Sequence, residues 1–260
     1  MHILYIHQHF ATPQSASGTR SFVFSKKLLE AGHKVTILTS EGYLPQEYRR
    51  LQHFEIEGIQ VVNIRSGYTL RLSFWKRVMS FLKFVIGAVR EGMRTPVDFV
   101  FATSTPLTVA IPALIMKFMR NIPFVFELRD LWPDVPVELG LIKNRMLIFL
   151  ARYLEKTAYR SADRIVCISD GICQNVAAPP KKKITIPTGC DLHAFQAKKD
   201  ARWKKESGIR EKALFVFTGA IGEANAPDYL IEAARILQDD GQNDIAIALI
   251  GAGSAKERVK

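Results

Sequence analysis

Four charged residues cluster at the end of one apolar run in this sequence. The run PFVFEL contains Glu127, and Arg129, Asp130 and Asp134 follow it together with Trp132. Carboxylates suit hydroxyl groups or proton transfer, an arginine suits an anionic oxygen, and a tryptophan suits the apolar face of a sugar. The pattern therefore predicts a sugar-binding and catalytic edge carried by Glu127, Arg129 and Asp130. The alternative is a buried arginine–aspartate pair that braces the loop.

A long loop near the N-terminus ends in a glycine just before a predicted helix. This loop is HQHFATPQSASGTR, residues 7–20, with Gly18 followed by Thr19 and Arg20. Glycine lets an anion approach the free N–H groups of a first helical turn, where Thr19 can cap and Arg20 can add positive charge. The loop predicts a phosphate or diphosphate site; the alternative is an ordinary strand-to-helix turn. The pattern GxGxxG is absent, which disfavours NAD binding.

Two further glycine loops follow apolar runs near the C-terminus. They are FTGAIGEAN and LIGAG, and their glycines are Gly219, Gly222, Gly251 and Gly253. A glycine loop between a strand and a helix is again the geometry of an anion site, and tight turns are the alternative. In IPTGCDLHAF, by contrast, Pro187, Gly189 and Asp191 indicate a tight turn between domains rather than chemistry.

Other kinds of site lack support in the sequence. No Ser-His-Asp order, P-loop or HExxH motif occurs, and we expect no metal site. Most of the scattered histidines are interpreted as solvent or turn residues; these are His7, His9, His33, His53 and His193. The cysteines fit neither a disulfide framework nor a CxxC pair, which indicates a reducing cytosol: Cys167, Cys173 and Cys190. The N-terminus does not resemble a secretory signal, and no transmembrane helix is expected.

Composition indicates a globular protein with an anionic partner. The chain has 260 residues, 48% of them hydrophobic, and a formal net charge of +11. Such a charge favours nucleotide phosphate, acidic lipid or nucleic acid. Residues 71–94 predict a basic helix with an aromatic-rich apolar face, which can lie on an anionic membrane; the alternative is a helix that covers the core. The net charge is the only feature that favours nucleic-acid binding, and we do not expect this function.

The chain alternates short apolar runs with longer segments of helical period. Strands are expected at 1–7, 34–39, 60–65, 99–102, 124–128, 164–168 and 184–186, and helices at 19–31, 72–92, 106–119, 144–161 and 170–177. Helix-length crossovers imply parallel neighbouring strands, and nearly continuous apolar strands imply helices on both faces. The sequence therefore predicts a doubly wound α/β domain, whose ligands bind beyond the carboxyl ends of the strands.

A second α/β unit begins after a polar, lysine-rich segment. We expect a first domain over residues 1–188, a connection over 189–212 and an incomplete second domain over 213–260. The expected elements of the second are strands at 214–218 and 245–250 and a helix at 227–237. Two strands and one helix do not cover both faces of a parallel sheet, so the prediction is a fragment, or a half that another polypeptide completes.

Several collinear motifs resemble one family. They are ILYIHQHF with SGTR, GHKVTILTS, ELRDLWPD, SADRIVCISDGI, IPTGCDLHAF, and FTGAIG with LIEAARIL. Together they resemble the retaining family-4 glycosyltransferases (group 1 type) of GT-B fold, over essentially all 260 residues. The string ELRDLWP is most similar to bacterial transferases of O-antigen and capsule assembly, including the N-acetyl-fucosaminyltransferase type.

The resemblance implies two Rossmann-like domains, a nucleotide-sugar donor between them, and a lipid-linked or saccharide acceptor. It places Gly18, Thr19 and Arg20 at the diphosphate, and Glu127, Arg129 and Asp130 at the reacting sugar. On the donor side, Gly219 and Gly222 match the diphosphate loop, and Gly251 and Gly253 match the loop near the base. The implied transfer retains anomeric configuration, requires no metal, cofactor or covalent nucleophile, and depends on charge stabilisation of the departing diphosphate.

Two departures from the family pattern bear on activity. Glu223, Asn225 and Ala226 stand where many members have an arginine and a lysine, and the family's E-x7-E segment would lie beyond Lys260. We therefore expect weak donor binding and slow turnover, unless a second chain supplies the rest of the donor domain. The alternative function is a non-catalytic truncated product or subunit that binds membrane or a partner chain. The expected location is the cytoplasm; the membrane alternative for residues 71–94 would place the chain peripherally on the inner face of the cytoplasmic membrane.

Overall fold

The chain divides into two compact units, Met1–Gly189 and Cys190–Lys260. The structure is a computed structural model, and it describes residues 1–15, 18–69, 72–189, 202, 206–210, 213–222 and 225–259. Each unit is described by itself below. Five residues discussed above lie outside the described ranges: Cys190, Asp191, His193, Glu223 and Lys260.

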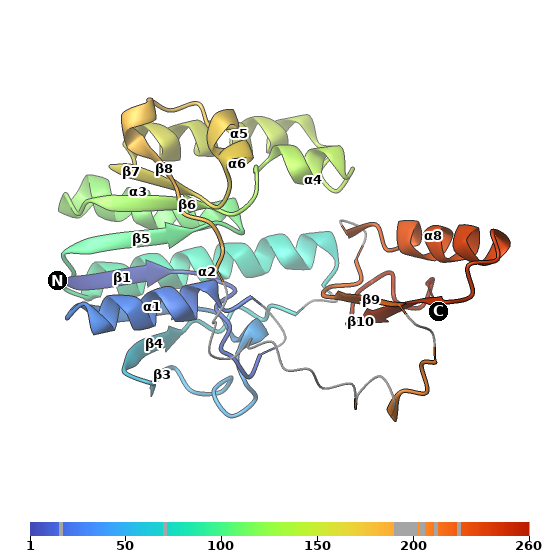
Figure 1. The fold of residues 1–260 in the computed structure, drawn as a ribbon. Coiled ribbons are helices and arrows are strands. Elements are labelled where there is room, and N and C mark those ends of the chain that lie inside the picture. Colours follow the sequence, from blue (N-terminus) through green and yellow to red (C-terminus); the bar gives the residue numbers. More distant parts are fainter. Residues whose placement is uncertain are drawn as a thin grey trace. The chain divides into compact units, whose positions relative to one another are not determined.

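The first unit is built on one eight-stranded sheet (Figure 1). Its strands are β1 (His2–Ile6), β2 (Lys34–Thr39), β3 (His53–Ile56), β4 (Ile59–Asn63), β5 (Phe99–Thr103), β6 (Phe124–Leu128), β7 (Arg164–Cys167) and β8 (Lys183–Thr185). Their order is β3-β4-β2-β1-β5-β6-β7-β8, and every pair is parallel except β3 with β4. This order confirms the predicted doubly wound sheet, with β1 at its centre.

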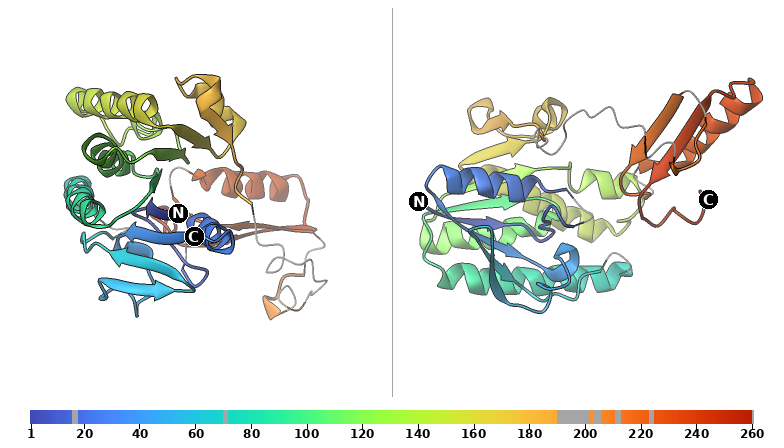
Figure 2. Two further views of the ribbon diagram at one scale, coloured as in Figure 1. Left: turned by 90° about the vertical axis from the view of Figure 1, so that its left-hand side faces the viewer. Right: turned by 60° about the horizontal axis from the view of Figure 1, so that its bottom comes forward.

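Helices cover both faces of this sheet. They are α1 (Arg20–Glu30), α2 (Phe74–Arg94), α3 (Ala110–Arg120), α4 (Asp134–Glu138), α5 (Arg145–Ser161) and α6 (Asp170–Asn175), with short 3-10 helices at Glu41–Tyr43, Leu107–Val109 and Pro180–Lys182. α2, α3 and α5 lie side by side on one face, and α1 lies on the other (Figure 2). Most of the helices connect parallel strands, as the crossover rule requires.

Strand β1 shows how the apolar runs build two cores. Leu4 and Ile6 belong to the core beneath α2, α3 and α5, whereas Tyr5 belongs to the core beneath α1, and all three are fully buried. Successive side chains of a strand point to opposite faces, so a run without polar residues must be covered on both. This explains why the central strands read as continuous hydrophobic sequence.

The helix boundaries follow from local signals in the sequence. α1 ends at Glu30, and Gly32, two residues later, has a φ of +80°, the left-handed conformation that glycine adopts without strain. Asn144 caps α5, because its side chain accepts hydrogen bonds from the backbone N–H groups of Met146 and Leu147. Ser169 caps α6 in the same way through Ile172. These ends agree with the predicted helices to within a few residues.

The prediction missed the edge hairpin and one short helix. β3 pairs with β4 through a two-residue turn at Glu57 and Gly58, with φ of +50° and +86°. Two positive φ values are the mark of a tight hairpin turn, and the Glu-Gly sequence disguised it because asparagine or aspartate is the usual first residue. Helix α4 was missed because it is short and contains Pro136; the other proline, Pro133, occupies the position just before its first residue.

The second unit contains a parallel strand pair and one helix. β9 (Ala213–Thr218) pairs with β10 (Ile245–Ile250), and α8 (Asp228–Asp239) connects them. These bounds agree closely with the predicted strands and helix. Throughout the described part of the chain, helices fall short of the length and apolar character needed to cross a lipid bilayer.

Candidate functional site

A pocket of about 390 Å³ lies where the sheet order changes direction. The chain leaves β1 towards α1 on one face of the sheet and leaves β5 towards α3 on the other, so a crevice forms at their carboxyl ends. The lining residues come from the loops after β1, β2, β4, β5, β6 and β7: His7, His9, Tyr43, Tyr68, Thr105, Arg129, Asp130 and Ile168. Six separate loops of the first unit thus converge on one pocket.

Arg129 is the principal positive charge of this pocket. Its backbone N–H donates to Ser104 Oγ (3.1 Å), which fixes the turn after β6. Its guanidinium Nη1 lies 3.3 Å from His7 Nε2. A Cβ added to Gly18 would lie 3.4 Å from Arg129 Nη2, so the glycine loop and this arginine border the same space.

His7 lies at the floor of the pocket as a neutral imidazole. Burial and the nearby charge of Arg129 hold its pKa well below the usual value. Because a guanidinium only donates hydrogen bonds, His7 Nε2 accepts from Arg129, and Nδ1 carries the proton that it donates to Ser21 Oγ (2.6 Å). The histidine thereby holds Arg129 in place without adding a second positive charge.

His9 stands among aromatic rings at one side of the pocket. Its ring centroid is 4.5 Å from that of Tyr68 and 5.3 Å from that of Tyr43. Burial, followed by the charges of Arg129 and Arg77, lowers the pKa of His9 to about 4. Nδ1 of His9 is buried and has no partner among the described residues. The uncharged His9 ring therefore adds to an aromatic wall of the pocket with Tyr43 and Tyr68.

Asp130 supplies a carboxylate at the mouth of the pocket. Its side chain is exposed, and Oδ2 accepts a hydrogen bond from Thr105 Oγ1 (2.7 Å). The carboxylate of Asp130 thus lies next to Arg129 in a pocket with neutral histidines and tyrosines. This combination can hold an anionic group through the arginine and polarise or orient a hydroxyl through the carboxylate.

Glu127 and Arg20 lie beneath the pocket rather than in it. Glu127 is completely buried, Arg20 is 5% exposed, and their Oε1 and Nη2 atoms are 2.9 Å apart. Thr103 Oγ1 donates to the other carboxylate oxygen, and Arg20 also donates to the carbonyl oxygens of Ile186 and Pro187. Neither side chain therefore reaches a ligand in the pocket. The sequence had suggested contact with the ligand for both. Its alternative was a buried arginine–aspartate pair within residues 126–140, whereas the observed pair joins Glu127 to Arg20 of α1.

Gly18 and Thr19 stand at the N-terminus of α1, next to Arg129. The expectation that Thr19 caps this helix with its side chain is wrong, since its hydroxyl makes no capping hydrogen bond to the described residues. The N–H groups of the first turn thus keep their capacity to bind an anion. They lie beside the pocket rather than among its lining residues, next to the Arg129 guanidinium that lines it.

Gly251 and Gly253 of the second unit have a packing role that the sequence did not reveal. A Cβ on Gly251 would lie 1.8 Å from the Gly219 carbonyl oxygen, and one on Gly253 would lie 2.1 Å from that of Ile221. The backbone N–H of Ile221 also donates to the carbonyl of Ala252 (3.0 Å). The loops after β9 and β10 therefore touch backbone to backbone. Gly222 differs, because its nearest neighbour would be Ser254 Oγ at 4.0 Å.

Two residues expected at the reacting edge serve the fold instead. Trp132 packs against the main core, and Asp134 forms an exposed ion pair with Arg152 (3.3 Å). The pocket also contains His7, His9, Tyr43 and Tyr68, which the sequence did not single out. His9 does lie in a turn, as expected for most of the histidines, whereas His7 is buried just after β1. The available signal was their position just beyond an apolar strand. Among the described residues, His, Cys, Asp and Glu side chains form no group of three that could hold a metal ion.

A family model described as Glycosyltransferase Family 4 matches residues 18–194. This range includes Gly18, Arg129 and Asp130, although not the histidines of the pocket.

Two curated relatives carry names from the same area of chemistry. The chain is 24% identical over 254 residues to a putative colanic acid biosynthesis glycosyl transferase WcaI of Escherichia coli (strain K12), covering 90% of this chain and 61% of that protein. It is 28% identical over 146 residues to a D-inositol 3-phosphate glycosyltransferase of Geodermatophilus obscurus, covering 48% of this chain and 32% of that protein. The chain thus spans less than two thirds of either relative.

Solved structures share the fold at low sequence identity. Sucrose-phosphate synthase from Thermosynechococcus elongatus matches with a TM-score of 0.66 and 14% identity, over 96% of this chain and 70% of that one. Anabaena HepE in complex with UDP and glucose matches with a TM-score of 0.63 and 15% identity, over 98% of this chain and 62% of that one. These likenesses confirm the predicted GT-B fold.

Proposed function

Because the chain belongs to glycosyltransferase family 4, we propose that it transfers a sugar from a nucleotide-sugar donor to a lipid-linked or saccharide acceptor. The reaction is a step of glycan or polysaccharide biosynthesis. The ELRDLWP motif favours a surface polysaccharide, such as O-antigen or capsule, as the product. The relative named for colanic acid biosynthesis supports a role in polysaccharide synthesis.

One observation carries the proposal. Arg129 and the N-terminus of α1 border the same space, within 3.4 Å at Gly18, and Asp130 lies at its mouth. A guanidinium and a helix N-terminus together stabilise a phosphate or diphosphate leaving group. The neighbouring aromatic wall of Tyr43 and Tyr68 suits a sugar ring, and the carboxylate suits a sugar hydroxyl.

These positions suggest a role for each residue. Arg129, with Gly18 and Thr19, neutralises charge on the departing diphosphate. Asp130 orients an attacking hydroxyl, and Arg20 with Glu127 holds the two loops in place. We propose transfer with retention of configuration and without a metal ion, as the family resemblance implies. Glu127 is ion-paired and fully buried, so it is unsuited to be a covalent nucleophile.

The glycine loops of the second unit are proposed to bind the donor nucleotide. Gly219 and Gly222 would approach the diphosphate, and Gly251 and Gly253 would approach the base. Their close backbone packing supports this only indirectly, because it shows a rigid pair of loops at strand ends where α/β sheets bind ligands.

Isothermal titration calorimetry tests donor binding most cheaply. UDP and UDP-glucose are the first probes, since one similar structure holds UDP with glucose and another holds UDP-2-fluoroglucose; other nucleotides follow. Saturable binding supports the enzyme. Lack of binding to any nucleotide at millimolar concentration contradicts it and favours the alternative, a non-catalytic chain that binds membrane or a partner.

We also propose that the outer face of α2 docks on an anionic membrane. Large apolar side chains are exposed along it, namely Trp75, Met79, Leu82 and Ile86, and Lys76 and Lys83 are exposed beside them. α5 on the same side of the sheet exposes Met146, Phe149, Leu150 and Tyr153. A mixed apolar and basic surface is suited to the headgroup region of an acidic bilayer, where a lipid-linked acceptor would be found.

The strand pair of the second unit leaves apolar side chains exposed. Phe215 is 61% exposed and Val216 and Ile250 are each 45% exposed. Parallel strands are normally covered on both faces. We propose that further polypeptide, of this chain or of a partner, covers them.

A further inference from the structure

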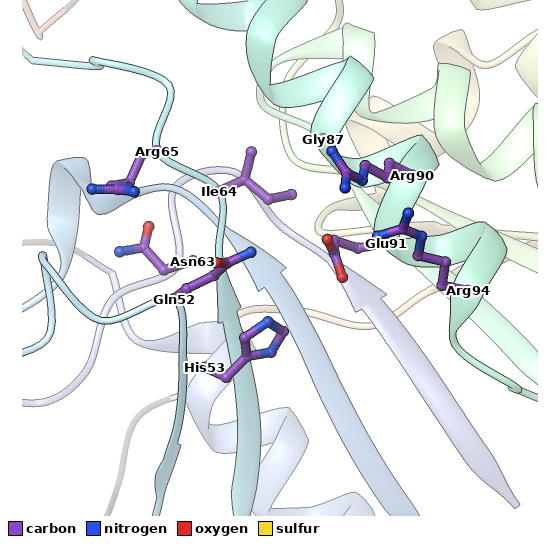
Figure 3. A pocket seen from close by; sticks show the side chains of 9 residues that line it. All are labelled: Gln52, His53, Asn63, Ile64, Arg65, Gly87, Arg90, Glu91 and Arg94. Carbon is purple, nitrogen blue, oxygen red and sulfur yellow. The ribbon is translucent and has the colours of Figure 1, made fainter.

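A second pocket, of about 470 Å³, lies between α2 and the hairpin of β3 and β4 (Figure 3). Its walls are polar and charged: Gln52, His53, Asn63, Arg65, Arg90, Glu91 and Arg94, with Ile64 and Gly87. It shares none of these residues with the pocket around Arg129. We call it the hairpin groove.

The groove exists because α2 comes unusually close to β4 at one point. A Cβ on Gly87 would lie 2.4 Å from Ile64 Cγ2, so only glycine permits this contact. One and two helical turns later, Arg90 and Arg94 stand on the same side of α2 as Gly87. Arg65 projects from the opposite wall, just after β4 (Figure 3).

The opposite wall is held by a buried amide. Asn63 is 1% exposed, and its Nδ2 donates to the carbonyl oxygens of Arg49 and Leu51, each at 3.0 Å. These bonds tie the segment before β3 to the end of β4. Gln52 and Arg65, the residues that follow these anchors, therefore belong to a rigid wall rather than to a free loop.

The three arginines of the hairpin groove are not neutralised. Arg65, Arg90 and Arg94 are exposed, and none forms an ion pair with a described residue. Glu91 is the one carboxylate among the lining residues, and it too is outside the ion pairs of the described chain. Three guanidinium groups against one carboxylate leave a positive field within a concave surface.

We propose that the hairpin groove binds an acidic saccharide, through a carboxylate or phosphate group that the arginines grip. A guanidinium pairs with two oxygens of such a group at once. Arg90 and Arg94 stand on one wall of the groove and Arg65 on the other, with the Arg65 guanidinium turned away from Arg90 in the view of Figure 3. Gln52 and His53 supply donors and acceptors for the sugar hydroxyls. This site lies apart from the transfer pocket and would hold a charged unit of a glycan during or between transfers.

Titration calorimetry of the full chain with three probes tests the ligand class. Glucuronate and glucose 6-phosphate carry the two oxyanions, and glucose is the uncharged control. We expect both charged sugars to bind and glucose not to bind. Equal binding of glucose, no binding of either charged sugar, or binding only to vesicles of phosphatidylglycerol would overturn the proposal.

Variants locate that binding within the protein. Arg90→Gln/Arg94→Gln should weaken charged-sugar binding at least about tenfold, because two charge-assisted contacts are lost. Lys76→Gln/Lys83→Gln removes the same charge from the same helix outside the groove and should leave the affinity within about twofold. An equal loss in both pairs would contradict a specific site.

Two further variants separate this site from the transfer pocket and from misfolding. Glu91→Gln removes the opposing carboxylate and should strengthen charged-sugar binding. Damage to the fold would weaken binding instead, so the two effects are distinguishable. Arg129→Ala should leave charged-sugar binding at the hairpin groove unchanged, so failure of the transfer proposal would not affect this result. Weaker binding in Glu91→Gln, or loss in Arg129→Ala, would overturn the assignment to the hairpin groove.

Discussion

Arg20 and Glu127 form a buried ion pair 107 residues apart in the sequence, with 2.9 Å between Nη2 and Oε1. The pair joins the first turn of α1 to the end of β6. Gly18 precedes Arg20 by two residues and Arg129 follows Glu127 by two, and a Cβ on Gly18 would lie 3.4 Å from Arg129 Nη2. The pair therefore fixes the distance between the glycine loop and the arginine that we propose to act on the diphosphate.

Replacing Glu127 by glutamine should lower the stability of the fold. The change leaves Arg20 charged and buried without its partner, which typically costs about 3–5 kcal/mol. Urea denaturation measures this loss as a decrease in the free energy of unfolding. Asp130→Asn is the matched control, and because Asp130 is exposed we expect a change of no more than about 0.5 kcal/mol. If Glu127→Gln retained full stability and lost activity, Glu127 would belong to the chemistry instead.

His9 should make the fold sensitive to acid. Its pKa is lowered to about 4 by burial and by Arg129 and Arg77, whereas the unfolded chain keeps the ordinary value. The unfolded state therefore binds the proton more readily, and stability falls as the pH drops from about 6.5 to about 4, by up to about 3 kcal/mol. His9→Gln should reduce this slope in denaturation at a series of pH values. An imidazole NMR titration of His9 with a midpoint near 6.5 would contradict the burial.

Gly251→Ala and Gly253→Ala should destabilise the second unit. Each methyl group would meet a carbonyl oxygen at 1.8 or 2.1 Å, so the two loops must separate, at a cost of about 1–3 kcal/mol or more. Hydrogen exchange of β9 and β10 amides reports this locally. The methyl group of Gly222→Ala would meet open space, so this variant should not change the exchange rates of the same amides. Unchanged exchange in Gly253→Ala would show that the loops do not touch.

If the outer face of α2 docks on a membrane, the protein should float with lipid vesicles, and its flotation should depend on their lipid composition. Met79→Asn/Ile86→Asn should reduce binding to vesicles that contain phosphatidylglycerol, and Lys76→Gln/Lys83→Gln should cost about 1 kcal/mol per lysine. Val23→Asn, on α1 at the other face of the sheet, is the control and should float as the wild type does. Equal binding to neutral vesicles, or no effect of the α2 variants, would contradict docking through α2.

Most of the fold could be predicted because its signals are local. β2, β6 and β10 have the bounds expected from their apolar runs, and Gly32 and Asn144 mark helix ends as their residue types suggest. The edge strand β3 was missed because its alternation is short and its turn is Glu-Gly, a weak hairpin signal. Edge strands need fewer apolar residues than central ones, so periodicity identifies them poorly.

The pocket could be predicted only in part, for a different reason. Strand ends pointed to Arg129 and Asp130, since parallel strands present their following loops at one edge. What the sequence could not show is which charges pair with one another. Arg20 and Glu127 look like ligand contacts until the fold brings them together, and His9 looks like a loop residue until Tyr43 and Tyr68, from other loops, enclose it.

The central claim is that Arg129 stabilises the leaving diphosphate, and the turnover of Arg129→Ala tests it most directly. With the nucleotide sugar that calorimetry identifies, kcat should fall about 100- to 1,000-fold, the range for losing one group that stabilises developing charge. Arg164→Ala, at the amino end of β7 and away from the pocket, should keep wild-type turnover and serves as the control. A kcat within about threefold of the wild type for a folded Arg129→Ala protein would contradict the account.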